Sequence, residues 1–431
     1  MSATATPSAL PARPPLYTQL DRSIIWFPLM LVLFEFSVYI GNDMIQPAML
    51  TITQEYGADS AWVPTSMTLY LLGGAVLAWC VGPMSDRWGR RPVMLGGALL
   101  YALANFAILL APTIEAFMAM RFVQGIALCF ISAVGYVSIQ EAFEEKTAIK
   151  VMALMANVAM VAPLLAPLLG AGILSHPLGS WQLIFVLIGA IALISLLGLT
   201  RAMPETAVRL EKADTLGQIG RSYLAVLRNR PFLLLALATP LSGLPLLTWI
   251  ALSPLMLIRD MSLPTWAYGL AQVPVFAGLI LGNITLARVT DRVVVGRTIQ
   301  WAMPLMAVGA ALLLACSLAG LGCPLQISLL LGGMAVICFA EGLTFAVLYR
   351  LSLMASDAPK GVVAAALSMG VAVLYALGIE GGKLTYVAFG LPGFAVFSAL
   401  GLLAFAFCVK GVLREAIAAR SLDKASAAPM H

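Results

Sequence analysis

The sequence predicts an all-α membrane protein whose twelve transmembrane helices form two pseudo-symmetric six-helix bundles. Of its 431 residues, 61% are hydrophobic and only 10% are charged, whereas about 25% of residues are charged in an average soluble domain. Mostly apolar runs, each near the roughly 20 residues that cross a bilayer as a helix, recur from Ile24 to Val412. This pattern excludes a soluble globular protein.

The apolar runs fall into two groups of six. They lie near residues 24–50, 61–83, 92–112, 116–139, 148–174 and 181–200, and then near 231–258, 265–290, 298–320, 324–350, 360–386 and 391–411. The expected domains are an N-terminal tail (1–22), a first bundle (23–200), a polar linker (201–230), a second bundle (231–412) and a C-terminal tail (413–431).

The positive charges predict the orientation in the membrane. With a cytoplasmic N-terminus, 22 of the 25 Lys and Arg residues fall on the cytoplasmic side, Arg259 and Lys383 fall outside, and Arg121 lies within a helix. Lys and Arg are enriched in cytoplasmic loops. Because an even number of crossings returns the chain to its starting side, both termini and the linker are expected to be cytoplasmic. The first twenty residues lack the order of a cleaved signal peptide, so we expect the tail to stay attached.

The two halves carry a weak internal repeat. Trp62 opens the second apolar run and Asp86 closes it 24 residues later, while Trp266 opens the eighth and Asp291 closes it after 25 residues, each Asp being followed by Arg. Duplicated six-helix halves are a plan of secondary transporters, which bind their substrate near the midplane between the halves.

Composition disfavours other classes of function. The six cysteines (80, 129, 316, 323, 338 and 408) form no C-x-x-C pair and there are only two histidines, so we expect no metal site, haem or disulfide framework. The chain has no G-x-x-x-x-G-K-[ST] phosphate loop, and a membrane-embedded enzyme or sensor would need a catalytic cluster or signalling domain that the sequence does not display. We expect no cofactor and no nucleic-acid partner, with an ion gradient as the source of energy.

The first apolar run contains two acids on one side of a helix. Glu35 lies near its middle, and at about 100° per residue Tyr39 and Asn42 fall within about 40° of it, with Asp43 about 80° away and about 12 Å along. A charged side chain at the membrane centre costs at least about 2.5–3.5 kcal/mol, so Glu35 is expected to face a cavity or to be protonated. Proton and cationic substrate could then compete for the two carboxylates. Asp43 could instead be a solvated helix end, and Glu35 a neutral hydrogen-bonded acid.

Three other apolar runs carry polar or charged residues, each with two possible roles. In the fourth run, Arg121 needs acceptors or water because guanidinium keeps its proton; it could be a coupling residue or only a structural partner. Gln124, three residues on, could reach the cavity or only pack. Glu341 and Glu380 are acids within the tenth and eleventh runs, each a second protonation site or a neutral packing acid.

Two motifs resemble those of the major facilitator superfamily. The segment between the second and third runs resembles its helix 2 to helix 3 loop, with the residues Gly82, Asp86, Arg87, Gly89, Arg90 and Arg91. The glycines permit a tight turn. The Asp86–Arg90 pair would act as a latch that breaks when the two halves rock. The arginines could alternatively be topology anchors alone. The fifth run resembles the exporter motif, at Pro163, Pro167 and Gly170, but has Ala166 where a glycine normally precedes the second proline.

Together with the stretches 42–47, 62–68 and 153–159, these features resemble the MdfA-type multidrug/proton antiporters of this superfamily over nearly the whole chain. The resemblance implies a twelve-helix fold and, in the bacterial inner membrane, export of varied lipophilic cationic and neutral drugs, chloramphenicol-type compounds included, in exchange for protons. It makes Glu35, Asp43 and Arg121 the proton-coupling residues. The implied pocket residues are Tyr39, Asn42, Asp43, Gln124, Met155, Asn157, Ala159, Leu246, Leu247 and Ile250. The expected partners are the bilayer, drugs and protons, and the expected state is a monomer. A proton-coupled importer of the same fold is the nearest alternative, and the double proline disfavours it.

Overall fold

The structure, a computed structural model, describes residues 16–17, 24–207, 216–290, 292–294, 296–318, 323–356, 358 and 360–426. In these residues the regular secondary structure is helical, apart from one isolated bridge between Tyr17 and Phe143. Asp291, which belongs to the predicted repeat, lies outside the described residues.

The first half contains six apolar segments, several of them divided into shorter helices. Its helices are α1 (Trp26–Asp43), η1 (Gln46–Ala48), α2 (Met49–Glu55), α3 (Trp62–Val76), α4 (Ala78–Trp88), α5 (Arg90–Ala107), η2 (Ile108–Leu110), α6 (Ile114–Gly125), α7 (Ala127–Phe130), η3 (Ile131–Gly135), α8 (Tyr136–Ala142), α9 (Glu145–Ser175) and α10 (Trp181–Ala202). Together, α3 and α4 form one membrane span with a bend of 43°.

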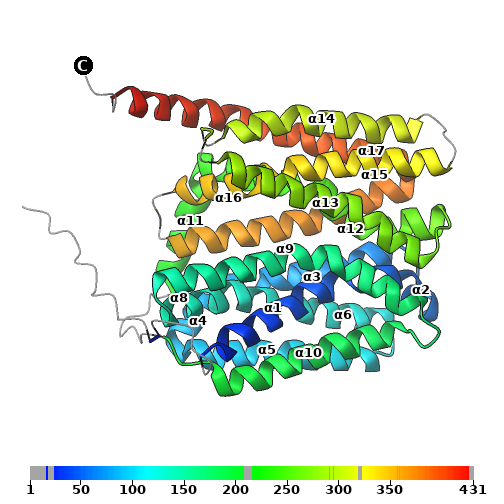
Figure 1. The fold of residues 1–431 in the computed structure, drawn as a ribbon, viewed down its shortest axis with the longest axis horizontal. Coiled ribbons are helices and arrows are strands. Elements are labelled where there is room, and N and C mark those ends of the chain that lie inside the picture. Colours follow the sequence, from blue (N-terminus) through cyan, green and yellow to red (C-terminus); the bar gives the residue numbers. More distant parts are fainter. Residues whose placement is uncertain are drawn as a thin grey trace, which may run out of the picture.

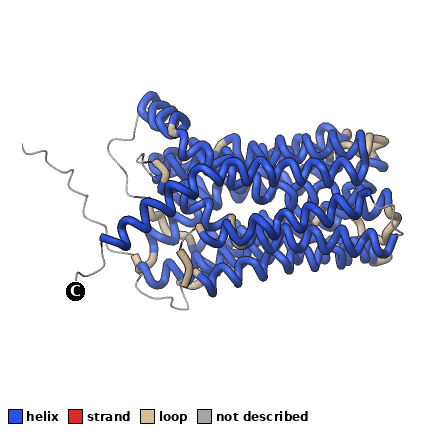
Figure 2. Tube along the Cα trace, turned by 90° about the horizontal axis from the view of Figure 1, so that it is seen from above, coloured by secondary structure: helices blue, strands red, loops and turns tan. Residues whose placement is uncertain are grey.

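The second half follows the helix α11 (Leu216–Arg228). Its helices are α12 (Arg230–Ser253), η4 (Pro254–Asp260), α13 (Thr265–Val289), α14 (Arg297–Leu318), α15 (Cys323–Gly342), α16 (Phe345–Met354) and α17 (Lys360–Ser426). Figure 1 shows α1–α10 and α12–α17 as two stacked groups of nearly parallel helices, and Figure 2 shows the same arrangement from above, with helix along most of the tube.

The described helices contain the twelve expected crossings. Ten stretches are long and apolar enough to cross a membrane, and the bent pair α3–α4 is a further one. The last stretch, Gly361–Lys410, has 50 residues, which at 1.5 Å per residue would extend about 75 Å through a hydrocarbon core of about 30 Å. It is interrupted at Gly390, where φ is 61° and ψ is −145°, so it is two spans. The prediction of an all-α membrane protein with twelve spans is therefore confirmed.

The linker contains a helix that its polar composition did not predict. Within it, α11 packs on the second half, where Val226 is fully buried with Phe232, Val363 and Leu367. The predicted domain boundaries and cytoplasmic placement of the linker stay predictions, because the structure contains no membrane.

Small residues allow the helices of the first half to approach closely. A Cβ at Gly125 of α6 would collide with the backbone of Tyr70 on α3, and one at Gly73 of α3 would collide with the carbonyl of Phe122 on α6. Such contacts are typical of helix packing in membranes, where small residues replace the hydrophobic driving force that lipid does not provide.

Candidate functional site

The α1 acid Glu35 is fully buried and only partly satisfied. Its Oε1 accepts a hydrogen bond of 2.9 Å from the Tyr136 hydroxyl on α8, and its Oε2 has no hydrogen-bond partner. No ion pair to Glu35 is found in the described part of the chain. An ionised carboxylate in this position would have the Tyr136 hydrogen bond, but no ion pair among the described residues, to compensate for the water it has lost.

The second α1 acid, Asp43, is the last residue of the same helix and is 4% exposed. Its Oδ1 accepts a hydrogen bond of 2.8 Å from the Asn42 side chain. Asp43 also lies within electrostatic reach of Arg121 on α6 and of Tyr268 on α13. It is thus a buried acid at the boundary between the halves, and the solvated helix end considered for it is not what this structure shows.

Arg121 is fully buried and tied to α1 and α3 by hydrogen bonds rather than by an ion pair. Its Nε donates to Ser66 Oγ (3.0 Å), and its Nη1 to the Gly41 carbonyl (3.2 Å). Its Nη2 lies 3.4 Å from both the carbonyl and the side-chain oxygen of Asn42. The guanidinium carbon is 4.7 Å from the ring centre of Tyr70, a cation–π distance. Asn42 therefore contacts Asp43 and Arg121 at once.

Gln124 extends this network into the first half. It accepts a hydrogen bond of 2.8 Å from Arg121 Nη1 and donates to the Asn105 side chain at 3.3 Å. Asn105 in turn donates to the Tyr101 carbonyl at 2.8 Å. Gln124 is 1% exposed, so in this conformation it holds Arg121 in place and does not present its amide to an open surface.

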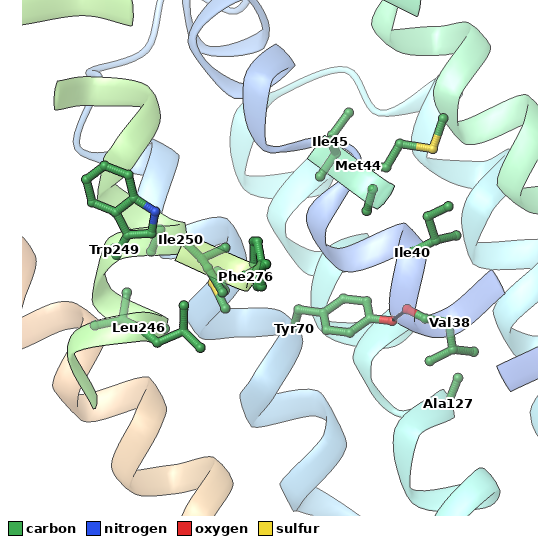
Figure 3. Close-up of a cluster of buried hydrophobic side chains, with 14 of the residues drawn as sticks. Val38, Ile40, Met44, Ile45, Tyr70, Ala127, Leu246, Trp249, Ile250 and Phe276 are labelled. Carbon is green, nitrogen blue, oxygen red and sulfur yellow. Dashed lines mark hydrogen bonds between the residues drawn. The ribbon is translucent and has the colours of Figure 1, made fainter. Parts of the chain in front are cut away.

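The predicted pocket residues differ in exposure. Tyr39 and Asn42 are half-buried, and Tyr39 is within electrostatic reach of Glu35 and of Tyr349 on α16 in the second half. The structure assigns the remaining members as follows: Met155, Leu246 and Ile250 are buried, Leu247 and Ala159 are half-buried, and Asn157 is exposed on α9. Figure 3 shows Leu246 and Ile250 of α12 in one buried cluster with Tyr70 of α3 and Val38 of α1.

The junction of α4 and α5 contains the predicted pair of Asp86 and Arg90, which belongs to a larger ionic cluster. Asp86 Oδ1 lies 2.6 Å from Arg90 Nη1, and Arg90 also bonds Glu141 of α8 at 2.9 and 3.2 Å. Gly89 has φ 107°, which glycine adopts readily, and makes the turn into α5. Gly82 does not make a turn: it lies inside α4, and a Cβ there would meet nothing within 4 Å. That part of the prediction was wrong, because α4 continues through Gly82 to Trp88.

The chain that leaves α10 completes this cluster. Glu205 accepts hydrogen bonds from the backbone N–H groups of Arg90 (2.8 Å) and Arg91 (3.3 Å), where it caps α5. Thr206 donates to Glu141 Oε2 at 2.7 Å. Arg91 donates to the Thr200 carbonyl at 2.6 Å, and Arg87 is exposed.

The proline-containing part of α9 packs against both halves. A Cβ at Gly170 would collide with the carbonyl oxygen of Met44, so the glycine permits α9 to touch the end of α1. Across the boundary, Gly269 of α13 lies against Ala171 and the Pro167 carbonyl. Pro163 and Pro167 both lie inside the continuous helix α9.

Among the described residues, three hydrogen bonds join the halves at the end of the molecule where α3 begins. Thr68 donates to Glu380 at 2.9 Å, and Lys383 donates to Thr65 at 2.9 Å and also pairs with Glu380. Arg259 donates to Ser60 at 2.8 Å.

Several partners of the site could not be found from the sequence. They are Ser66, Tyr70, Asn105, Tyr136, Glu141 and Glu205. Each is an ordinary residue in its own helix or loop, and only the packing of distant segments makes it a partner. Within the described residues, no group of three or more His, Cys, Asp or Glu side chains could hold a metal ion.

The chain is similar to known membrane transporters. Residues 31–382 match the Major Facilitator Superfamily. The chain is 49% identical over 393 residues to the chloramphenicol resistance protein CraA of Acinetobacter baumannii, with 90% of this chain and 93% of that protein covered. It is 48% identical over 402 residues to the multidrug transporter MdfA of Edwardsiella ictaluri, with 93% and 97% covered.

Solved structures show the same fold at low sequence identity. A bacterial homologue of the human lysosomal transporter Spinster, inward-facing and unoccupied, matches with a TM-score of 0.67 at 16% identity, covering 93% of this chain and 96% of that one. The nucleoside transporter NupG matches with a TM-score of 0.68 at 14% identity, covering 90% and 99%.

Proposed function

The chain belongs to the major facilitator superfamily, and we propose that it exports lipophilic cationic and neutral drugs, chloramphenicol-type compounds included, in exchange for protons. It is a multi-pass membrane transporter and not an enzyme. The names of relatives with 48–49% identity support drugs as its cargo. We place it in the bacterial inner membrane as a monomer with both termini cytoplasmic, and the distribution of Lys and Arg supports this orientation.

The observation that carries the proposal is the burial of Glu35 with one carboxyl oxygen unpartnered. Without a cation nearby, the neutral acid is far less costly in this position than the carboxylate. A cationic drug beside Glu35 or Asp43 would supply the missing counter-charge and favour loss of the proton. Proton and drug thus bind in competition, and each favours release of the other.

The Arg121 network couples this exchange to the shape of the first half. Asn42 donates to Asp43 and also accepts from Arg121, which is bonded to α3 through Ser66. A change in the charge of Asp43 changes the strength of its hydrogen bond with Asn42. Asn42 then moves closer to Asp43 or closer to the Arg121 guanidinium. A local protonation event therefore alters the contact between α1, α3 and α6.

In the proposed alternating access, polar contacts join the halves at one end, and at the other end an ionic cluster joins α4, α5, α8 and the start of the linker. The hydrogen bonds at Ser60, Thr65 and Thr68 close the end that the charge distribution places outside. The cluster around Arg90 lies at the other end of α4, on the predicted cytoplasmic side. Rocking of the halves opens one end as the other closes, which is the motion that transporters of duplicated halves use.

The proton gradient supplies enough energy for this exchange. One charge that moves down 100 mV releases about 2.3 kcal/mol, equivalent to about a fiftyfold concentration ratio. One proton per molecule of neutral drug would therefore sustain useful export, whereas exchange of one proton for a monovalent cationic drug moves no net charge and draws on the pH gradient alone.

Drug flux in everted membrane vesicles under an imposed pH gradient tests the proposal. With the inside of the everted vesicle acidic, ethidium and chloramphenicol should accumulate in vesicles that contain the protein and not in vesicles from cells without it. Accumulation that persists after a protonophore has dissipated the gradient would refute proton coupling.

A further inference from the structure

The second half contains a buried acid that the exchange at α1 does not use. Glu341 lies at the end of α15 and is 5% exposed, and its Oε2 has no hydrogen-bond partner. Within the described residues, none of the ion pairs includes it. A carboxyl group in this environment is unfavourable as an anion and acceptable as a neutral acid.

The helix that carries Glu341 is interrupted directly after it. The apolar span Pro324–Met354 is divided between α15, which ends at Gly342, and α16, which begins at Phe345. Both the backbone N–H and the hydroxyl of Thr344 donate to the Glu341 carbonyl, at 2.9 and 3.0 Å. Glu341 lies about 25 Å along the span from Pro324, near its middle. Breaks in membrane helices near the midplane are places where transporters bind protons and other small cations.

Where the structure describes them, the helices around Glu341 leave room for the carboxyl group, and no basic side chain pairs with it. A Cβ at Gly243 of α12 would collide both with Glu341 Oε1 and with the Tyr375 hydroxyl of α17, so both polar groups converge on this glycine. A Cβ at Gly342 would lie 2.7 Å from Asn283 N on α13. The titratable groups within electrostatic reach are Tyr375 and Cys338, and both are neutral at physiological pH.

We infer that Glu341 is a second proton-carrying acid, housed in the second half, so that a transport cycle exchanges more protons than the α1 acids alone would carry. The inference rests on the proposed antiport. In the conformation of this structure Glu341 is protonated. When rocking of the halves admits water at the break, the acid O–H bond is broken, the proton passes to water, and the carboxylate keeps the bonding electrons until it is protonated again.

The proton-to-drug ratio in reconstituted liposomes tests the inference. With chloramphenicol as the probe, the drug gradient that balances an imposed pH gradient gives the ratio directly. Glu341→Gln keeps the size of the side chain and cannot release a proton, so its ratio should fall by about one relative to the unmodified protein. Glu115→Gln, at an exposed position of α6, should leave the ratio unchanged. An unchanged ratio in Glu341→Gln, with pH-driven transport intact, would overturn the inference.

This outcome differs from failure of the proposed function itself. If the unmodified protein transported chloramphenicol without regard to the pH gradient, the antiport would be refuted, whatever the behaviour of Glu341→Gln. If flux through the unmodified protein required Na⁺ at constant pH and this requirement vanished in Glu341→Gln, the site would bind a metal cation and the inference would be wrong.

A measurement on the unmodified protein avoids dependence on the folding of a variant. Dicyclohexylcarbodiimide reacts with protonated carboxyl groups in apolar surroundings, and mass spectrometry locates the modified residues. Glu341 should be labelled at pH 6 and progressively less as pH rises, whereas exposed Glu115 should show little labelling throughout. Absence of label on Glu341 at pH 6, with Glu35 labelled in the same sample, would contradict its protonation.

Discussion

Under the proposed function, Glu35 is the side chain that would distinguish charged from neutral cargo. One of its oxygens is held by Tyr136, and the other has no partner in the buried interior of the first half. A cation that enters beside it gains an electrostatic partner, whereas a neutral drug gains at most a hydrogen bond. The identity of this residue therefore matters more for cationic substrates.

Replacing Glu35 by glutamine should separate the two substrate classes. Glu35→Gln keeps the shape and removes the charge, so export of ethidium should fall at least about tenfold, while chloramphenicol export should fall much less. Efflux assays in cells with matched protein levels measure both. Equal loss for the two drugs would count against a role of Glu35 in recognising charge.

Removing the hydroxyl of Tyr136 should alter proton binding without removing the acid. Tyr136→Phe deletes the hydrogen bond to Glu35 Oε1, a contact worth about 0.5–1.5 kcal/mol. The hydroxyl stabilises the carboxylate, so its loss should favour the protonated acid and move the pH dependence of ethidium transport to higher pH. An unchanged pH profile would mean that the bond has no part in proton release.

At the scale of the elements, the predicted exporter motif in α9 contains a close steric contact at Gly170. Gly170 touches the backbone of Met44, whereas a Cβ at Gly172 on the same helix would meet nothing within 4 Å. Of these two glycines, only Gly170 is required for the close contact between α9 and the end of α1.

Alanine substitution at these two glycines makes a matched pair. Gly170→Ala forces α9 away from α1 and should destabilise the protein by about 1–3 kcal/mol, whereas Gly172→Ala should have little effect or stabilise the helix slightly. Thermal unfolding of the detergent-solubilised variants compares them. Similar melting temperatures for both would show that the close approach is not required for stability.

The latch is an element-scale feature in which a turn, a helix end and the linker meet. Asp86→Asn weakens the ion pair with Arg90 but leaves Arg90 bonded to Glu141. We expect slower turnover with drug affinity largely intact, because the described partners of Asp86 and Arg90 do not include either α1 acid. Equilibrium binding of labelled drug in detergent, measured beside the transport rate, checks this. A collapse of binding would contradict the latch role.

At the scale of the whole molecule, the two halves are joined at one end by a small set of polar contacts. Lys383 bonds Thr65 and Glu380, and Glu380 bonds Thr68. Because each half is internally well packed, these contacts are easier to break than the halves themselves. They are suited to hold one conformation closed without preventing the other.

Lys383→Met should therefore open this end more often. Loss of the bonds to Thr65 and Glu380 should shift the population toward the conformation that is open at the end of the molecule where α3 begins. The distance between spin labels placed on α3 and α17 should then be longer. Lys410→Met, exposed at the opposite end, is the control. The prediction fails if the distance distribution of Lys383→Met matches that of the control.

The sequence by itself determined the number of spans, the two six-helix halves and the chemical candidates. Apolar run length and the avoidance of charge in lipid are local requirements that every segment must meet separately, so they can be read without a structure. The same logic identified Glu35, Asp43 and Arg121, since a charge in an apolar run is conspicuous in any arrangement. The break at Gly390 falls between the predicted runs 360–386 and 391–411, whereas the helix α11 was not foreseen, because it does not extend an apolar run.

Only the tertiary structure decided which partners these residues have. Tyr136 reaches Glu35, Asn42 joins Asp43 to Arg121, and Glu205 caps α5 from beyond α10. The proposal for Glu341 also depends on the tertiary structure, because only the structure shows that its Oε2 has no hydrogen-bond partner and that the helix breaks between α15 and α16. Hydrogen bonds and desolvation depend on atoms within a few ångströms, and segments far apart in the chain supply those atoms only after the helices have packed.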